Sequence, residues 1–169
     1  VLNKLFKFKK LFIYMESPMI NNLYDFYKST CQKYPEKMLF DDKITYGEAI
    51  KLAEQRAAFL QSEGFKKGDV IGLLAISNAE WCLTYMAINC IGGIVLPLDI
   101  NLPKENFPAM LKRLKAKALF VSDDFKGAVK GIKTYSVSIN KSLEKKKKFK
   151  LPKMEENDTA TYIYTSGTT

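Results

Sequence analysis

Three short runs of apolar residues, rich in β-branched side chains and separated by longer helical stretches, constrain the fold most strongly. The runs cover residues 70–76, 94–98 and 118–121. Continuous apolar runs of this length are typical of strands that are covered on both faces. Strands that alternate with helices join into a mainly parallel sheet through right-handed crossovers. We therefore predict an α/β fold, with a mainly parallel sheet and helices on both of its faces.

End signals fix the bounds of the first two predicted helices. A helix that begins near Asn22 ends at Pro35, because a residue before proline is pushed out of the helical region. Thr45 and Glu48 form a capping box three residues apart, which starts a second helix. Gly64 provides the left-handed residue that stops it.

Weaker signals predict the remaining elements. Ser77 or Asn78 can cap a helix that is apolar on nearly all sides and should be deeply packed. Pro103 marks the start of another helix, at an early position where its missing N–H costs nothing. Residues 38–44 predict a short hairpin, and residues 133–138 predict a fourth strand.

The sequence divides into four regions by composition. They are a basic tail (1–18), an α/β unit (19–139), a charged linker (140–158) and a last region (159–169). The last region holds a predicted strand at 161–164 and the first half of a loop. The sequence does not begin with Met, and Met15 or Met19 is a plainer start. The tail is therefore interpreted as upstream sequence, with a membrane-surface amphipathic arm as the alternative.

The net charge of +9 is concentrated at two places. Lys4, Lys7, Lys9 and Lys10 of the tail contribute +4, and residues 141–153, with seven Lys and one Glu, contribute +6. All other residues, Glu16 included, together carry −1. A lysine run is usually a solvated segment, and the sequence lacks the interleaved aromatic residues of a nucleic-acid platform. We therefore expect no nucleic acid as a partner.

Cysteine and histidine usage narrow the chemistry further. Cys31, Cys82 and Cys90 are odd in number and lack C-x-x-C spacing, which favours reduced, buried thiols in a cytosolic protein. The sequence has no His, the commonest metal ligand and general base. The longest apolar stretch, 90–98, is too short to cross a bilayer. We predict a cytoplasmic location, with peripheral membrane contact through the tail as the alternative.

The last residues of the sequence, 162–169, join a β-rich run to a small, hydroxyl-rich turn. They read Tyr-Ile-Tyr-Thr-Ser-Gly-Thr-Thr. A strand that leads into such a turn can present backbone N–H groups and hydroxyls to a phosphate. Gly167 lets the backbone approach a ligand without a Cβ in the way. The pattern predicts part of a nucleotide site.

This ending resembles the phosphate loop of the adenylate-forming superfamily, which includes acyl-CoA synthetases, peptide-synthetase adenylation domains and luciferases. Members typically read Tyr-Thr-Ser-Gly-Thr-Thr-Gly-x-Pro-Lys-Gly, of which the first six positions match. Five further motifs resemble the family in its own order, with Ala49 in place of a usual Leu. They are residues 44–48, 64–70, 78–81, 92–99 and 116–123. Trp81 is expected in the core and Asp99 at a turn. Functional roles are therefore transferred from the family only to the loop residues.

The resemblance implies that ATP activates a carboxylic acid as an acyl-adenylate, which an acyl-CoA synthetase then transfers to CoA. It implies ATP, Mg²⁺ and CoA as cofactors, and a small-molecule carboxylic acid and the remainder of the same polypeptide as partners. It also implies that five loop residues bind the phosphates, with Thr165 contacting the metal. They are Thr165, Ser166, Gly167, Thr168 and Thr169. No catalytic residue is expected in this sequence, so the fragment alone should be inactive.

Three functions stay open at this point. A fatty-acyl-CoA synthetase of fatty-acid metabolism is favoured by the motif at 78–81 and by the long basic linker. An amino-acid adenylation domain of a peptide synthetase is the alternative, because residues 97–99 suit it as well. A non-catalytic polyanion- or nucleotide-binding module would use the lysine run at 145–148. A P-loop NTPase is excluded, because Gly-x-x-x-x-Gly-Lys-Ser/Thr is absent.

Overall fold

A four-stranded parallel sheet forms the centre of the protein. The computed structural model describes residues 21–40, 43–138 and 148–164. The strands, in spatial order, are β4 (Ile94–Pro97), β3 (Val70–Leu74), β5 (Ala118–Val121) and β6 (Lys133–Ser136). Each neighbouring pair is parallel. The predicted mainly parallel sheet is therefore confirmed.

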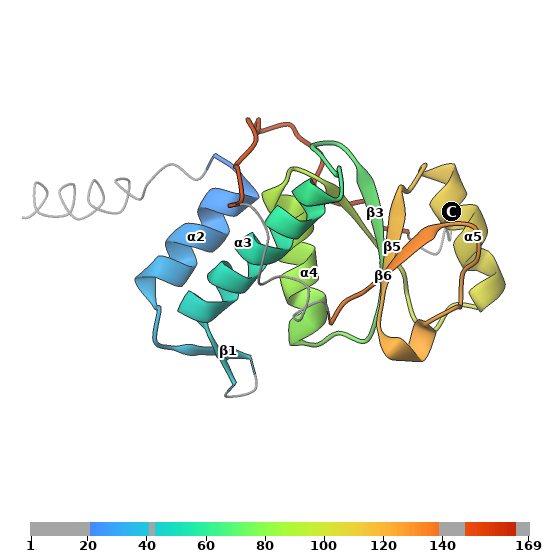
Figure 1. Cartoon of the computed structure of the whole chain (residues 1–169), viewed down its shortest axis with the longest axis horizontal. Coiled ribbons are helices and arrows are strands. Elements are labelled where there is room, and N and C mark those ends of the chain that lie inside the picture. The colour runs from blue at the N-terminus through green and yellow to red at the C-terminus, as the bar shows by residue number, and fades with distance from the viewer. Residues whose placement is uncertain (1–20, 41–42, 139–147, 165–169) are drawn as a thin grey trace, which may run out of the picture.

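Helices cover both faces of this sheet (Figure 1). One face carries α3 (Tyr46–Ser62) and α4 (Ala79–Cys90), with α2 (Leu23–Lys33) packed on the outside of these two helices, and the other carries α5 (Phe107–Arg113). Neighbouring residues of a strand point to opposite faces, so two apolar clusters form, one on each side. The central strands β3 and β5 are apolar throughout because both of their faces are buried, whereas the edge strand β6 has polar and exposed residues.

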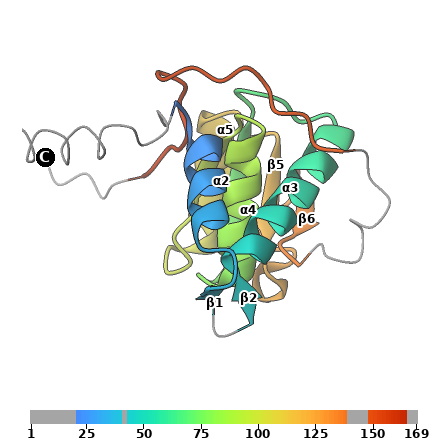
Figure 2. The ribbon, with the colours of Figure 1, turned by 90° about the vertical axis from the view of Figure 1, so that its left-hand side faces the viewer.

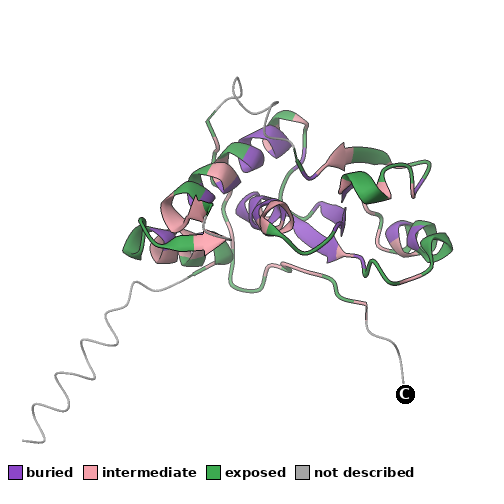
Figure 3. Ribbon diagram, turned by 90° about the horizontal axis from the view of Figure 1, so that it is seen from below, coloured by how far each residue is buried: buried purple, intermediate pink, exposed green. Residues whose placement is uncertain are grey.

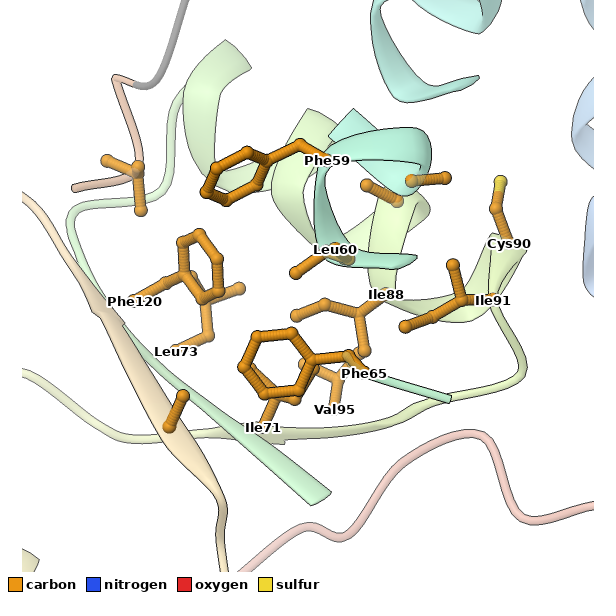
Figure 4. Close-up of a cluster of buried hydrophobic side chains, with 14 of the residues drawn as sticks. Phe59, Leu60, Phe65, Ile71, Leu73, Ile88, Cys90, Ile91, Val95 and Phe120 are labelled. Carbon is orange, nitrogen blue, oxygen red and sulfur yellow. The ribbon is translucent and has the colours of Figure 1, made fainter. Parts of the chain in front are cut away.

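The larger of the two clusters lies between the sheet and α3 and α4. Figure 4 shows Ile71, Leu73 and Phe120 of the sheet pointing toward Phe59 and Leu60 of α3. Figure 3 shows the same pattern as burial, with buried residues along the strands and on the helix sides that face them. The sheet is therefore held mainly by this helical layer.

On the opposite face, α5 approaches the sheet at a glycine. A Cβ added to Gly72 would lie 2.7 Å from Leu111 Cδ2 and 2.8 Å from Leu119 Cδ1, closer than real Cβ contacts. Leu111 belongs to α5 and is 3% exposed. The missing side chain at position 72 is what lets this helix pack closely.

The predicted ends of α3 are confirmed. The backbone N–H of Glu48 donates to Thr45 Oγ1 at 3.2 Å, and the N–H of Thr45 donates to Glu48 Oε2 at 2.9 Å, which completes the capping box. Gly64 follows the helix with a φ of 88°. The antiparallel hairpin of β1 (Met38–Phe40) and β2 (Ile44–Thr45) is also confirmed.

Several predicted bounds differ from the structure. β6, expected over residues 133–138, ends at Ser136, and β4, expected over residues 94–98, ends at Pro97. The helix expected from Pro103 begins as a 3₁₀ turn, η1 (Lys104–Asn106), and α5 proper starts at Phe107. The reason is Pro108, which suits the first turn of a helix but would lack an N–H bond and clash in its interior. β3 ends at Leu74 rather than residue 76, where the Ile76 side chain is 47% exposed.

The described part of the predicted linker packs against the helical layer. We call residues 148–160 the strap; Figure 2 shows it crossing the ends of the helices. The Gln61 amide donates to the Lys150 carbonyl oxygen at 2.6 Å and accepts from its N–H at 3.0 Å. The Phe149 and Tyr24 rings lie 5.4 Å apart. Residues 1–20 and 139–147, which hold the tail and most of the lysine run, lie outside the described residues. Among the described helices, none has the length and apolar character needed to span a membrane.

Candidate functional site

A cleft of about 1070 Å³ lies at the carboxyl edge of the sheet, where β3 and β4 end. Its walls come from the turns after these strands, from the start of α4, from α5 and from the end of the described chain. They include Ser77, Trp81, Asp99, Met110 and Tyr164. In parallel α/β sheets, ligands bind outside the carboxyl ends of the strands. This cleft is therefore the candidate functional site.

The wall formed by α4 begins with an N-cap. Asn78 Oδ1 accepts from the Trp81 backbone N–H at 3.0 Å, which confirms the predicted cap. The Trp81 side chain is only partly buried; it lines the cleft and stacks on Tyr85, with 5.3 Å between the ring centroids. The prediction that Trp81 belongs to the core is therefore wrong in part. An apolar helix pattern does not distinguish a core position from a cleft wall.

The turn after β4 forms a second wall. Asp99 Oδ1 accepts from the Asn101 backbone N–H at 2.9 Å and from its side-chain amide at 3.0 Å. The Leu102 N–H donates to the Asp99 carbonyl oxygen at 3.1 Å, which closes the turn. The predicted turn role of Asp99 is confirmed. Its place in the cleft could have been found from the sequence, because it directly follows the carboxyl end of a predicted strand.

The described walls of the cleft suit an uncharged or cationic group better than a phosphate. The charged residues among them are Asp99 and Glu105, and these walls include no Lys or Arg. No group of three or more His, Cys, Asp and Glu that could hold a metal is found in the described part of the chain. Phosphate oxygens would therefore need donors from another segment, and the hydroxyl and backbone donors of residues 165–169 have the right chemistry.

The segment that leads to those residues runs along the free edge of β4. The Val95 N–H donates to the Ala160 carbonyl oxygen at 3.0 Å, and the Tyr162 N–H donates to the Val95 carbonyl oxygen at 2.9 Å. These two bonds form one parallel bridge, between Val95 and Thr161. Parallel pairing directs the chain toward the carboxyl edge, where the cleft lies.

The predicted strand at 161–164 is wrong beyond this single bridge. The next outward-facing donor of β4 would be Pro97, which has no N–H and cannot extend the ladder. Ile163 is 73% exposed, and the Tyr164 hydroxyl donates to the Met110 carbonyl oxygen of α5 at 3.3 Å. The chain thus leaves β4 and enters the cleft wall.

The five predicted phosphate-binding residues follow Tyr164 directly in the sequence. They are Thr165, Ser166, Gly167, Thr168 and Thr169, and they lie outside the described residues. Their roles, including the metal contact of Thr165, therefore stay predictions. What the structure adds is that the residues just before them, Ile163 and Tyr164, line the cleft.

The curated proteins similar to this chain include several peptide synthetases. Gramicidin S synthase 2 of Brevibacillus brevis is 30% identical over 153 residues, which make up 87% of this chain and 3% of that protein. Bacitracin synthase 1 of Bacillus licheniformis is 29% identical over 156 residues, 90% of this chain and 3% of that protein. The chain therefore spans only a few per cent of the length of the relatives it matches.

Solved structures with the same fold include two that were determined with a bound ligand. The N-terminal subdomain of NpsA from Klebsiella oxytoca, solved with 3-hydroxybenzoyl-AMSN, aligns with a TM-score of 0.78 and 23% identity, over 88% of this chain and 38% of that one. O-succinylbenzoate coenzyme A synthetase (MenE) from Bacillus subtilis, solved with AMP, aligns with a TM-score of 0.74 and 23% identity, over 85% and 39%. At this identity the likeness shows the fold, that of the N-terminal subdomain of adenylate-forming enzymes.

A family model provides the assignment. The model described as "AMP-binding enzyme" matches residues 27–169, which include the sheet, both helical layers and the predicted phosphate loop. The fold alignments agree with this match over most of the chain. The chain belongs to the family of AMP-binding, adenylate-forming enzymes.

Proposed function

We propose that this chain is part of an amino-acid adenylation domain of the peptide-synthetase type, which activates its substrate carboxylate with ATP. The observation that carries the proposal is the arrival of residues 163–164 at the carboxyl-edge cleft, immediately before the phosphate-loop sequence. The similarity to gramicidin and bacitracin synthases favours an amino acid over a fatty acid as substrate. The sequence motifs favoured a fatty-acyl-CoA synthetase over an amino-acid adenylation domain, and the proposal reverses this order.

The loop residues would act by binding and orientation. ATP, bound with Mg²⁺, supplies the adenylyl group and the pyrophosphate leaving group. The backbone N–H groups of residues 165–169 and the hydroxyls of Thr165, Ser166, Thr168 and Thr169 would hold the β- and γ-phosphates. Thr165 would in addition contact the metal. Fixed donors of this kind offset the repulsion between an anionic carboxylate and a polyanion, and alignment contributes several kcal/mol to lowering such barriers.

The rest of the same polypeptide is proposed to complete the site. The relatives are far longer than this chain, so the remaining substrate-binding and catalytic groups are assigned to sequence outside residues 1–169. The acceptor of the activated group would be a carrier protein. CoA, fatty-acid substrates, a cytoplasmic location and peripheral membrane contact through the tail stay predictions.

An acyl-CoA synthetase is the second candidate, because a coenzyme A synthetase shares the fold. MenE aligns over 85% of this chain, close to the 88% for NpsA. The described cleft walls bear two carboxylates and otherwise neutral side chains, which do not distinguish an amino acid from another carboxylic acid. The two candidates therefore differ in substrate and acceptor, and not in the first chemical step.

ATP–pyrophosphate exchange on the complete encoded polypeptide tests the proposal. The substrate panel holds the proteinogenic amino acids, aryl acids and fatty acids of several chain lengths. We expect exchange with one or a few amino acids. Exchange only with fatty acids, together with thioester formation on added CoA, would transfer the assignment to the second candidate. A folded polypeptide that shows no exchange with any acid contradicts adenylation.

A matched pair of threonine variants tests the loop assignment. Thr168→Val removes one loop hydroxyl. We expect the KM for ATP to rise about tenfold, because this factor corresponds to the loss of one hydrogen bond to a charged group. Thr134→Val removes a hydroxyl that bonds the Ile132 carbonyl oxygen at 3.2 Å on β6, away from the cleft. This control should leave exchange unchanged. Equal effects of both variants would contradict the assignment of the loop to the ATP site.

A further inference from the structure

One face of α4 holds the segment that leads into the phosphate loop. Trp81, Tyr85 and Asn89 are spaced by four residues and therefore lie on the same side of the helix. Trp81 lines the cleft, the Tyr85 hydroxyl hydrogen-bonds the Thr161 hydroxyl, and the Asn89 amide reaches the carbonyl oxygen of Ala160. The cleft wall and the segment at 160–162 thus share one support.

The Asn89 amide is oriented by a second helix. The Tyr27 hydroxyl of α2 donates to Asn89 Oδ1 at 3.0 Å, so Nδ2 is the atom that faces Ala160, to whose oxygen it donates at 3.1 Å. Burial raises the pKa of Tyr27 above its ordinary value of 10.0, so this phenol stays a donor also at alkaline pH. Asn89 is 3% exposed, so its amide has little competition from water.

The Tyr85 hydroxyl is oriented by its own neighbour on the helix. The rings of Tyr85 and Trp81 stack with an interplanar angle of 25°. This contact fixes the direction of the phenol toward Thr161, four residues before the first predicted phosphate ligand. On the other side of the segment, Val95 contributes only the two bonds of an isolated bridge. The helix therefore supplies as many direct hydrogen bonds to this segment as the sheet does.

We propose that Tyr85 and Asn89 are positioning residues, which hold residues 160–162 from the helix side and thereby set where the phosphate loop begins. The proposal rests on the proposed function, because it assigns to residues 165–169 the binding of ATP phosphates. A segment held in place before the ligand arrives loses less conformational freedom on binding. Loss of either bond should therefore weaken ATP binding without removing any group that contacts the nucleotide.

The test uses Tyr85→Phe in the complete encoded polypeptide, since this change removes one hydroxyl and keeps the ring stack. We expect the KM for ATP in pyrophosphate exchange, and the Kd for ATP by calorimetry without acid substrate, to rise about three- to tenfold, as expected for one hydrogen bond. The KM for the acid should stay the same. The backbone amide of Tyr162, which bonds Val95, should exchange its hydrogen faster.

Tyr24→Phe is the matched control. Its hydroxyl donates to Glu54 Oε1 at 2.8 Å between α2 and α3 and accepts from Lys28 Nζ at 3.2 Å. The variant therefore also loses phenol hydrogen bonds of the helical layer, with no contact to residues 160–162. It should leave the ATP constants unchanged. A rise of equal size in both variants would show a general loss of stability and overturn the proposal.

Thr161→Val removes the same hydrogen bond from the other side and provides the second variant. We expect the double variant, Tyr85→Phe with Thr161→Val, to raise the KM for ATP no more than either single change, because both remove one interaction. Multiplied effects overturn the proposal. If the parent neither binds ATP nor exchanges pyrophosphate, the proposed function fails, and Tyr162 amide exchange alone then decides whether α4 holds the segment.

Discussion

Arg56 offers the sharpest test of how the helical layer is held together. It belongs to α3 and is 1% exposed, yet it carries a full charge in an apolar cluster. Its guanidinium donates to the Glu80 carbonyl oxygen and to Thr84 Oγ1, both at 3.0 Å, and forms an ion pair with the Glu80 carboxylate. The acceptors all lie on the first turns of α4. Arg56 therefore joins α3 to the start of α4.

Arg56→Met removes the charge and keeps most of the side-chain volume. Loss of one partner from a buried ion pair costs about 3–5 kcal/mol of folding free energy. The Glu80 side chain is 26% exposed, and water can solvate part of its carboxylate, so we expect the lower end, about 3 kcal/mol. A free-energy loss of this size corresponds to a fall in Tm of about 6–12 °C for a chain of this length.

Urea unfolding and thermal scans of parent and variant measure this cost. Arg113→Met on α5 is the control, because Arg113 is exposed, and it should change stability by less than about 0.5 kcal/mol. Glu80→Gln keeps an acceptor beside Arg56 and should cost less than Arg56→Met. The double variant should cost less than the sum of the single changes, since the two residues are in contact. An Arg56→Met loss no larger than that of the control would refute the ion pair as a structural link.

Three further predictions concern packing, capping and pH. Gly72→Ala places a methyl group 2.7 Å from Leu111 Cδ2 and 2.8 Å from Leu119 Cδ1, and the resulting overpacking should cost about 1–3 kcal/mol in urea unfolding, whereas no loss would mean that these two leucine side chains move aside freely. Asn78→Ala removes the acceptor for the Trp81 N–H and should cost about 1 kcal/mol, with Asn78→Asp retaining stability as the control. Burial raises the pKa of the Cys90 thiol from an ordinary 9.0 to about 12, so its contribution to stability is full below pH 9 and is lost as the pH rises toward 12. Cys90→Ala should therefore flatten the decline in stability between pH 9 and pH 11, and an unchanged slope would contradict this.

Local sequence signals predicted the sheet and the helix ends well. The capping box at Thr45, the stop at Gly64 and the strand at residues 118–121 agree with the structure, because each depends on neighbours in the chain. Pro108 and Pro97 were present in the sequence and account for the two largest differences, the late start of α5 and the short ladder after Thr161. Their effect on helix and ladder was predictable from the missing N–H alone.

Contacts between distant segments could not be predicted in the same way. The Asn89 bond to Ala160 and the Gln61 bonds to Lys150 join residues 71 and 89 positions apart, and no local pattern encodes such distances. A charged segment with Lys and Glu is expected to be solvated, yet the strap is held by hydrogen bonds of its backbone, by the Phe149 ring and by the ion pair of Asp158 with Lys67. The composition of a linker therefore indicates whether its side chains favour solvent. It gives little information on the hydrogen-bond partners of its backbone.

The location of the candidate site could be predicted from the sequence, whereas the helix contacts that support it could not. Parallel pairing places the carboxyl ends of all strands at one edge, so the direction of residues 160–162 follows from the fold class alone. Pro97 prevents β4 from binding that segment along its length, and a single bridge holds an edge strand weakly. The segment that leads into the proposed phosphate loop then needs support from a neighbouring element. In this protein α4 supplies it through Tyr85 and Asn89, and α4 is itself fixed to α3 by Arg56.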